Sequence, residues 1–214
     1  MVVHVWNAAT AARRVDRVIV ATDDERIADA VRVAGGEPML TSPAAVTGTD
    51  RVAEVARSVP ADVYVNVQGD EPLMPAENVD RVLATLLDWP GRRVATLSYP
   101  LAASAASDPD TVKVAVAENG RALYFSRSPI PYYRQGAPAH RKHLGIYAFL
   151  GQTLHELAAL PVSPLERAES LEQLRWLEAG YAIWVGEAAA DSIGVDTASD
   201  LEAAERAWKK EAIS

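Results

Sequence analysis

The regular alternation of short β-branched runs with helical patterns is the feature that most constrains how this chain can fold. Such alternation predicts a mostly parallel sheet with helices on its faces. Residues 17–22 (RVIVAT) and 62–67 (DVYVNV) are predicted strands, and the second is apolar enough for burial on both faces. After the first strand, Asp23 or Asp24 can cap a helix, and a second helix is expected over residues 51–58. The sequence therefore predicts an α/β fold.

The second half of the chain departs from this parallel pattern. Two alternating runs flank residues 118–120 (Glu-Asn-Gly), a combination that predicts an antiparallel hairpin. Further strands are expected over residues 143–150 and 181–185. Between them we expect a helix that starts with a capping box at Ser163 and stops at Gly180. The predicted architecture is a doubly wound, mostly parallel sheet with an antiparallel hairpin insertion.

The length and the net charge of the chain limit the functions that it can have. The length suits a single domain that spans residues 1–214. The 21 basic and 29 acidic residues give a net charge of −8, which argues against a protein that grips nucleic-acid phosphates. The chain has no apolar run of roughly 18 residues, so we expect no membrane insertion. Cysteine is absent, which excludes disulfides and thiolate chemistry and fits a cytoplasmic location.

Two acidic residues come just after predicted strands, where an open parallel sheet binds its ligands. Asp70, followed by Glu71, lies in QGDEP, and Asp196 lies in GVDT. Carboxylate oxygens at such an edge suit Mg²⁺, which completes its coordination with waters and substrate phosphates. Asp70 can equally belong to a solvated turn, and Asp196 can equally be a helix N-cap. The residues alone leave these alternatives open.

A basic segment stands out in this acidic chain. Arg127 and His143 lie at the ends of predicted strands, where they could bind a carboxylate or a phosphate. Arg134, Arg141 and Lys142 lie between them and fit a solvated basic loop as well as a binding site. The segment is therefore a candidate site for an anionic ligand.

Several common chemistries lack their motifs. The chain has no G-x-G-x-x-G after a strand, no Walker A sequence, no H-E-x-x-H and no G-x-S-x-G. Dinucleotide redox, P-loop transfer, zinc hydrolysis and α/β-hydrolase chemistry are thereby disfavoured. The acids Glu166, Glu169 and Glu172, taken alone, indicate the solvated face of an amphipathic helix. Of the reaction classes considered, metal-assisted chemistry on a phosphate is the one that these missing motifs leave.

Several segments together resemble a known enzyme family. The matching segments are VIVATDDERIADAV, TGTDRVAEV, VNVQGDEPLMPAENV, DPDTVKVAV, ALYFSRSPIP, HLGIYAF, SPLERAESLEQLRWLEAG and GVDTASDLEAAE, in this order. They are similar to the 3-deoxy-manno-octulosonate cytidylyltransferases, and NVQGDEP, HLGIY and LEQLR are especially specific to that family. The resemblance implies a Rossmann-like sheet of the nucleotide-diphospho-sugar transferase type.

The resemblance also implies a reaction and a site. CMP would pass from CTP to the anomeric hydroxyl of the acid sugar Kdo, giving CMP-Kdo and pyrophosphate, in a Mg²⁺-dependent cytoplasmic homodimer of lipopolysaccharide biosynthesis. Asp70 and Asp196 match the family's metal ligands and would be the catalytic residues. Residues expected to bind the acid sugar are Gln68, Arg127, His143, Tyr147, Glu172 and Gln173. Residues expected to bind the nucleotide are Ala21, Thr22, Asp23, Thr47, Gly48 and Thr49.

The N-terminal residues depart from the family pattern. Members of the family begin with a strand and a loop of the form P-A-R-x-x-S-x-R-x-P-G-K-P-L that wraps the triphosphate, whereas Met1–Val5 aligns with a later segment. The resemblance therefore implies that this strand and loop are missing, which would leave neighbouring strands unpaired and the chain severely impaired. Two alternatives remain: transfer to another acid sugar such as sialic acid, or a non-catalytic protein that binds an acid sugar or dimerises.

Overall fold

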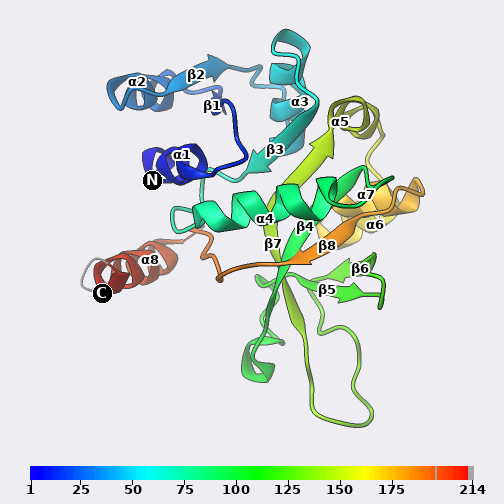
Figure 1. Cartoon of the computed structure of the whole chain (residues 1–214). Coiled ribbons are helices and arrows are strands. Elements are labelled where there is room, and N and C mark those ends of the chain that lie inside the picture. The colour runs from blue at the N-terminus through cyan, green and yellow to red at the C-terminus, as the bar shows by residue number, and fades with distance from the viewer. Residues whose placement is uncertain (196, 212–214) are drawn as a thin grey trace.

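The computed structural model describes residues 1–195 and 197–211, which form an α/β fold (Figure 1). The helices are α1 (Val2–Ala11), α2 (Glu25–Val33), α3 (Gly48–Ser58), α4 (Ala76–Leu87), α5 (Gly151–Ala158), α6 (Pro164–Glu169), α7 (Gln173–Glu178) and α8 (Ala198–Glu211), with a 3-10 turn at Ala103–Ala105. The strands are β1 (Ile19–Thr22), β2 (Glu37–Leu40), β3 (Val63–Val67), β4 (Val94–Pro100), β5 (Lys113–Val116), β6 (Ala122–Ser126), β7 (Arg141–Leu150) and β8 (Trp184–Glu187). No helix in these ranges is both long and apolar enough to cross a bilayer.

The strands form two separate sheets. β1 and β2 pair in parallel, from Ile19 opposite Glu37 to Thr22 opposite Leu40. The larger sheet has the order β6-β5-β7-β4-β8, and β3 also pairs with β7. Because β7 is antiparallel to both β3 and β4 while β8 is parallel to β4, the strands β3, β4 and β8 share one direction. The predicted mixture of parallel strands with an antiparallel excursion is confirmed.

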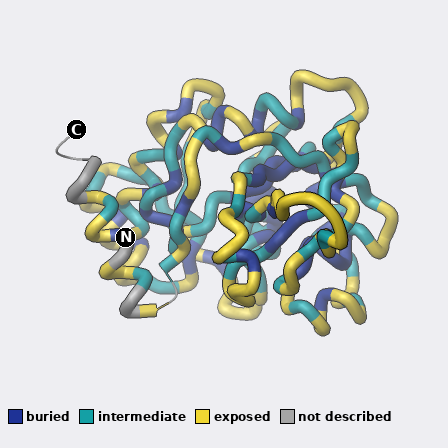
Figure 2. Tube along the Cα trace, turned by 90° about the horizontal axis from the view of Figure 1, so that it is seen from below, coloured by how far each residue is buried: buried dark blue, intermediate teal, exposed yellow. Residues whose placement is uncertain are grey.

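Helices cover both faces of the larger sheet. On one face, Val82 of α4 belongs to a core that includes Leu97 of β4. On the other face, α3 and α7 contribute Ala56 and Trp176 to a second core around Phe149 of β7. Figure 1 shows α4 crossing one face of the sheet, and Figure 2 shows the buried segments gathered in the interior. The result is a three-layered arrangement in which the carboxyl ends of the strands stay accessible.

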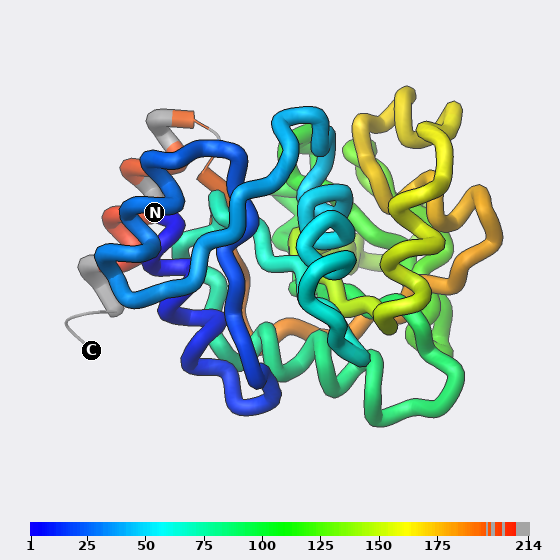
Figure 3. The backbone as a smooth tube through the Cα atoms, turned by 90° about the horizontal axis from the view of Figure 1, so that it is seen from above, coloured from blue at the N-terminus to red at the C-terminus, as the bar shows by residue number. Residues whose placement is uncertain are grey.

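The N-terminal elements lie beside the larger sheet. α2 starts at Asp24, whose side chain accepts a hydrogen bond from the Arg26 backbone N–H. It ends before Gly35, which has φ 85° and supplies the left-handed conformation at a helix end. Strand β2 is not predicted, because it is short and Pro38 interrupts its apolar pattern. Figure 3 shows α1 and α2 at the same end of the molecule as α8.

The hairpin insertion lies where it is predicted. β5 and β6 are antiparallel, and Gly120 in the turn has φ 86°, which favours glycine. The strand expected over residues 143–150 is present and begins earlier, at Arg141. The bounds predicted for the last strand are wrong. Its observed start is Trp184, because the preceding residue, Ile183, instead uses its carbonyl to accept a hydrogen bond from the Ala122 backbone.

The helix predicted between Ser163 and Gly180 is interrupted. The capping box of Ser163 with Glu166 is present, but Ser170 adopts a left-handed φ of 53° and separates α6 from α7. The break brings α7 back against α6, and Arg175 Nη2 lies 2.7 Å from Glu166 Oε1. Their side chains are only 6% and 11% exposed. The solvated face predicted for these acids is therefore wrong for Glu166, which forms a buried ion pair.

Candidate active site

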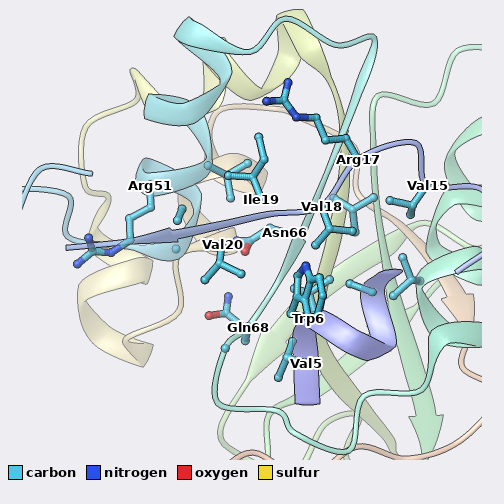
Figure 4. A pocket seen from close by; sticks show the side chains of 18 of the residues that line it. Val5, Trp6, Val15, Arg17, Val18, Ile19, Val20, Arg51, Asn66 and Gln68 are labelled. Atoms are coloured by element: carbon cyan, nitrogen blue, oxygen red, sulfur yellow. The ribbon is translucent and has the colours of Figure 1, made fainter. Parts of the chain in front are cut away.

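One cavity of about 970 Å³ extends along β1 and β3 to the N-terminus of α3 (Figure 4). At the carboxyl ends of the strands its lining is polar and includes Gln68 and Asp70. The predicted nucleotide-binding residues that line it are Ala21, Thr22, Thr47 and Gly48. Asp23 lies beside it and accepts a hydrogen bond from Arg51 at 2.9 Å, which lowers the pKa of the Asp23 carboxyl. The fold thus gathers residues from three distant segments at one end of the cavity.

The N-terminus of α3 is held in place by a half-buried carboxylate, that of Glu172. Thr47 caps the helix through a reciprocal capping box with Asp50. The hydroxyls of Thr47 and Thr49 also donate to the two oxygens of Glu172, at 2.8 and 2.9 Å. Burial raises the pKa of Glu172, and the two threonine hydrogen bonds oppose that shift. The prediction of a solvated face is therefore wrong for Glu172 as well. Its carboxylate connects a residue predicted to bind the sugar with two residues predicted to bind the nucleotide, Thr47 and Thr49.

Asp70 lies on the loop after β3, and its carbonyl accepts a hydrogen bond from the Val195 backbone at 2.9 Å. The segment that leads to Asp196 therefore lies against the Asp70 loop, while Asp196 itself falls outside the described residues. Within the described ranges, no group of three or more His, Cys, Asp or Glu side chains could hold a metal ion. A hard carboxylate at the polar end of an open cavity nevertheless suits Mg²⁺, which needs few protein ligands.

Gln68 connects the α3 terminus to the centre of β7. A Cβ added to Gly48 would lie 3.2 Å from Gln68 Nε2, and a Cβ added to Gly145 would lie 3.3 Å from Gln68 Cγ. The same Cβ at Gly145 would lie 2.8 Å from Glu71 Oε1. Burial raises the pKa of Glu71. Glycine at position 145 therefore leaves room for the loop that carries Gln68, Asp70 and Glu71.

We expect Gly145→Ala to destabilise the protein by about 1–3 kcal/mol, because the added methyl must displace a buried carboxylate in a packed site. Gly69→Ala is the matched control, since a Cβ at Gly69 meets nothing within 4 Å. Urea unfolding of the two variants measures the difference. Equal free energies of unfolding for the two variants would show that the close approach at Gly145 imposes no constraint.

A row of buried polar side chains crosses the centre of the larger sheet. Asn66 on β3 pairs with Tyr147 on β7, and Tyr147 pairs with Thr96 on β4. Asn66 Nδ2 and the Tyr147 hydroxyl are buried and have no hydrogen-bond partner in the described part of the chain. Unsatisfied buried donors are uncommon in folded proteins, and a polar ligand would satisfy them. Tyr147 is one of the residues expected to bind the acid sugar, and its role there stays a prediction. Asn66 was not predicted from the sequence, although it is a polar residue in the otherwise apolar run 63–67.

His143 lies at one end of this row and is neutral at physiological pH. Burial lowers the pKa of His143 to about 3. Thr96 Oγ1 donates to the Ile146 carbonyl at 2.7 Å and lies 3.0 Å from His143 Nε2, so Nε2–H donates to Thr96 and Nδ1 stays an acceptor. The imidazole therefore does not offer the positive charge that a sugar carboxylate would prefer.

This burial predicts a pH dependence of stability. The unfolded chain protonates His143 near its ordinary pKa of 6.5, while the folded chain resists protonation down to about 3. Stability from this residue is therefore present above pH 6.5 and is lost as the pH falls. Between pH 6.5 and 5, the free energy of unfolding should fall by roughly 1.5–2 kcal/mol more than in His143→Asn. Parallel pH dependences for the two proteins would contradict a buried neutral imidazole.

Arg127 lies at the end of β6 with its orientation fixed by backbone carbonyls. Its Nε donates to the Glu169 carbonyl and its Nη1 to the Pro109 carbonyl, both at 2.9 Å. The Arg127 carbonyl accepts from the ammonium of Lys113, whose side chain is fully buried. The Glu169 carboxylate accepts from the Arg127 backbone N–H at 2.9 Å, while the guanidinium itself donates to neutral carbonyls and can also meet an anionic ligand. Gln173 is also buried and begins α7 next to Glu172.

Comparison with known proteins identifies the family of this chain. A family model described as cytidylyltransferase matches residues 1–185. A 3-deoxy-manno-octulosonate cytidylyltransferase of Anaeromyxobacter sp. (strain K) is 50% identical over 208 residues, covering 95% of this chain and 85% of its own length. The enzyme of the same name from Chlorobium luteolum is 46% identical over 211 residues, covering 94% of this chain and 84% of its own length.

Comparison with solved structures points to the same family. The structure of CMP:2-keto-3-deoxy-manno-octonic acid synthetase complexed with CTP matches with a TM-score of 0.92 and 43% sequence identity, over 97% of this chain and 87% of the other. HddC from Yersinia pseudotuberculosis, at 11% identity and a TM-score of 0.64, shares the fold. With the family model covering most of its length and relatives at such identity, this chain belongs to the 3-deoxy-manno-octulosonate cytidylyltransferase family.

Proposed function

We propose that this protein transfers CMP from CTP to the anomeric hydroxyl of Kdo, releasing pyrophosphate. One observation carries the proposal: the fold brings Gln68, Asp70 and the Thr47–Thr49 helix start to one end of a single cavity. A similar chain was solved with CTP bound. In the reaction, the hydroxyl oxygen bonds to the α-phosphorus of CTP, its proton leaves, and the bond to pyrophosphate breaks.

The carboxylate of Asp70 would hold Mg²⁺ at the cavity, with Asp196 as the second ligand implied by the resemblance. When bound, the ion would neutralise charge on the phosphates and favour deprotonation of the attacking hydroxyl. Gln68 lies between Gly48 and Gly145, where its amide can orient the two substrates toward each other. The protein's own task is thus to position the reactants rather than to form a covalent intermediate.

The buried polar row would bind the acid sugar. The Tyr147 hydroxyl and Asn66 Nδ2 can donate to sugar hydroxyls. Arg127 offers a bidentate partner for the sugar carboxylate. Since His143 is neutral, it contributes a hydrogen-bond acceptor and Arg127 provides the charge. Glu172 would act where the sugar and nucleotide sites meet, because its carboxylate accepts hydrogen bonds from Thr47 and Thr49.

The test is the dependence of pyrophosphate release on the acid sugar, measured with CTP and Mg²⁺. Kdo should support release, and N-acetylneuraminate should support little. Faster turnover with N-acetylneuraminate would reassign the sugar. Binding of Kdo without pyrophosphate release at any protein concentration would favour a non-catalytic sugar-binding protein.

The proposal includes a cytoplasmic homodimer, as the resemblance implies. CTP as a substrate supports the location. The long loop between β6 and β7, in which Tyr132 is 88% exposed, offers apolar surface for self-association. Light scattering after size-exclusion chromatography should give twice the mass of one chain, and a single-chain mass would contradict the dimer.

A further inference from the structure

Lys113, the first residue of β5, carries a charge for which the proposed reaction has no use. Its side chain is fully buried, which is rare for a lysine. The ammonium donates to three main-chain carbonyls: that of Asp108 at 2.8 Å, that of Thr111 at 2.6 Å, and that of Arg127. Three acceptors require three N–H groups, so Lys113 is bound in its charged form. Burying a charge costs free energy that these hydrogen bonds offset.

The loop before β5 is held to the two neighbouring strands. Lys113 lies opposite Ser126 of β6 in the hairpin, which occupies one edge of the larger sheet (Figure 1). Two of the three carbonyls belong to this loop, and the third belongs to Arg127 at the end of β6. On its other side the loop contacts β7, because the Val112 carbonyl accepts a hydrogen bond from the His143 backbone at 2.8 Å. The ammonium thus ties together the main chain around two residues that are predicted to bind the sugar.

The same loop sets the direction of the Arg127 side chain. Its Nη1 donates to the Pro109 carbonyl in the loop, and its Nε donates to the Glu169 carbonyl at the end of α6. In the described part of the chain, these two hydrogen bonds engage two of the five N–H groups of the guanidinium and leave three for a ligand. Without the ammonium of Lys113, the converging carbonyl oxygens would lack a donor and would separate. Pro109 would move with them, and the guanidinium would lose one of its two fixed points.

We infer that Lys113 is a positioning residue for the acid-sugar site, which fixes the Arg127 guanidinium in the direction from which it meets the sugar carboxylate. The inference rests on the proposed function, because the sugar carboxylate is the ligand that Arg127 is proposed to bind. Lys113 itself touches no substrate, since its three N–H groups are used by main-chain carbonyls. Neither Lys113 nor Arg127 lines the cavity at which CTP is proposed to bind. Lys113 therefore governs the affinity for the sugar and leaves the affinity for CTP unchanged.

Steady-state kinetics of Lys113→Met test this role, with pyrophosphate release as the readout. Methionine has a similar length and supplies no hydrogen-bond donor, so the carbonyls lose their partner. The KM for Kdo should rise at least about tenfold, while kcat and the KM for CTP should stay within about threefold. Leu86→Ala is the control for a general loss of stability, because it empties part of the core beside α4. It should lower the midpoint of urea unfolding and leave the KM for Kdo unchanged.

The absence of cysteine allows the ammonium alone to be restored. In Lys113→Cys the introduced thiol is the only one in the chain, so 2-bromoethylamine converts it to a lysine-like side chain that ends in an ammonium. Iodoethane gives a side chain that lacks only the ammonium. Both forms are alkylated in urea and refolded, and the unchanged protein is carried through the same steps. The aminoethyl form should recover a KM for Kdo within about threefold of that of the unchanged protein, and the ethyl form should behave as Lys113→Met does.

The outcomes separate this inference from the proposed function. An unaltered KM for Kdo in Lys113→Met, or equal rises in the KM for Kdo and for CTP, would overturn the inference alone. Equal KM values for the aminoethyl and ethyl forms, or a rise in Leu86→Ala as large as in Lys113→Met, would do the same. If Lys113→Met and the ethyl form did not fold while the aminoethyl form did, Lys113 would serve the fold alone and the inference would be wrong. Failure of the unchanged protein to release pyrophosphate with Kdo would contradict the proposed function, and the inference would fall with it.

Discussion

Replacing Asp70 by asparagine is expected to lower the rate of CMP transfer by about a hundredfold or more. The substitution keeps the shape of the side chain and removes the negative charge that would hold Mg²⁺ beside the phosphates. Fold stability should change little, because Asp70 lies on a loop rather than in either core. Pyrophosphate release at saturating CTP and Kdo measures the effect.

The control for this substitution is Asp29→Asn, which removes one carboxylate from a side chain that is 70% exposed on α2. Its rate should stay within about twofold of the unchanged protein. A further readout is the Mg²⁺ concentration that gives half-maximal rate, which should rise in Asp70→Asn. If Asp70→Asn and Asp29→Asn turned over equally fast at the same Mg²⁺ concentration, Asp70 would not be a metal ligand.

Arg175→Met should destabilise the fold by about 3–5 kcal/mol, which is the usual penalty for breaking a buried ion pair by removing one partner. The change leaves the Glu166 carboxylate buried without the cation 2.7 Å away. Arg175 also donates to the Leu160 carbonyl, which holds the end of α5 to α7. Urea denaturation followed by circular dichroism gives the free energy of unfolding.

The exposed pair Arg32–Asp29 provides the comparison for this prediction. Its side chains are 50% and 70% exposed, so Arg32→Met should alter the free energy of unfolding by less than about 1 kcal/mol. Combining Glu166→Gln with Arg175→Met should recover part of the loss, because the buried charge is then removed as well. A loss in Arg175→Met no larger than in Arg32→Met would contradict a buried, charged pair.

Local signals allowed much of the fold to be predicted from the sequence. The cap at Asp24, the hairpin turn at Gly120 and the capping box at Ser163 all act within a few residues, and each is present. The break at Ser170 was not predictable, because it depends on Glu166 finding Arg175 across two helices. Strand β2 was missed for a similar reason: its pairing with β1 compensates for a weak local pattern.

The candidate site was likewise predictable from local sequence only in part. Asp70 was a candidate from its position after a predicted strand, and the family motif added Gln68; the structure places both at the cavity. The motif gave no indication that Glu172 bridges Thr47 and Thr49, since these residues meet only through the packing of α7 against the start of α3. Nor could the sequence show that His143 is neutral, because its pKa is set by burial at the centre of the sheet.

Mass spectrometry of the products from CTP, Kdo and Mg²⁺ shows whether this chain joins CMP to Kdo in the cavity that Asp70 lines. CMP-Kdo and pyrophosphate are expected in equal amounts, with both reduced together in Asp70→Asn. Release of CMP or free phosphate without a sugar conjugate, or a conjugate that forms equally well in Asp70→Asn, would contradict this expectation.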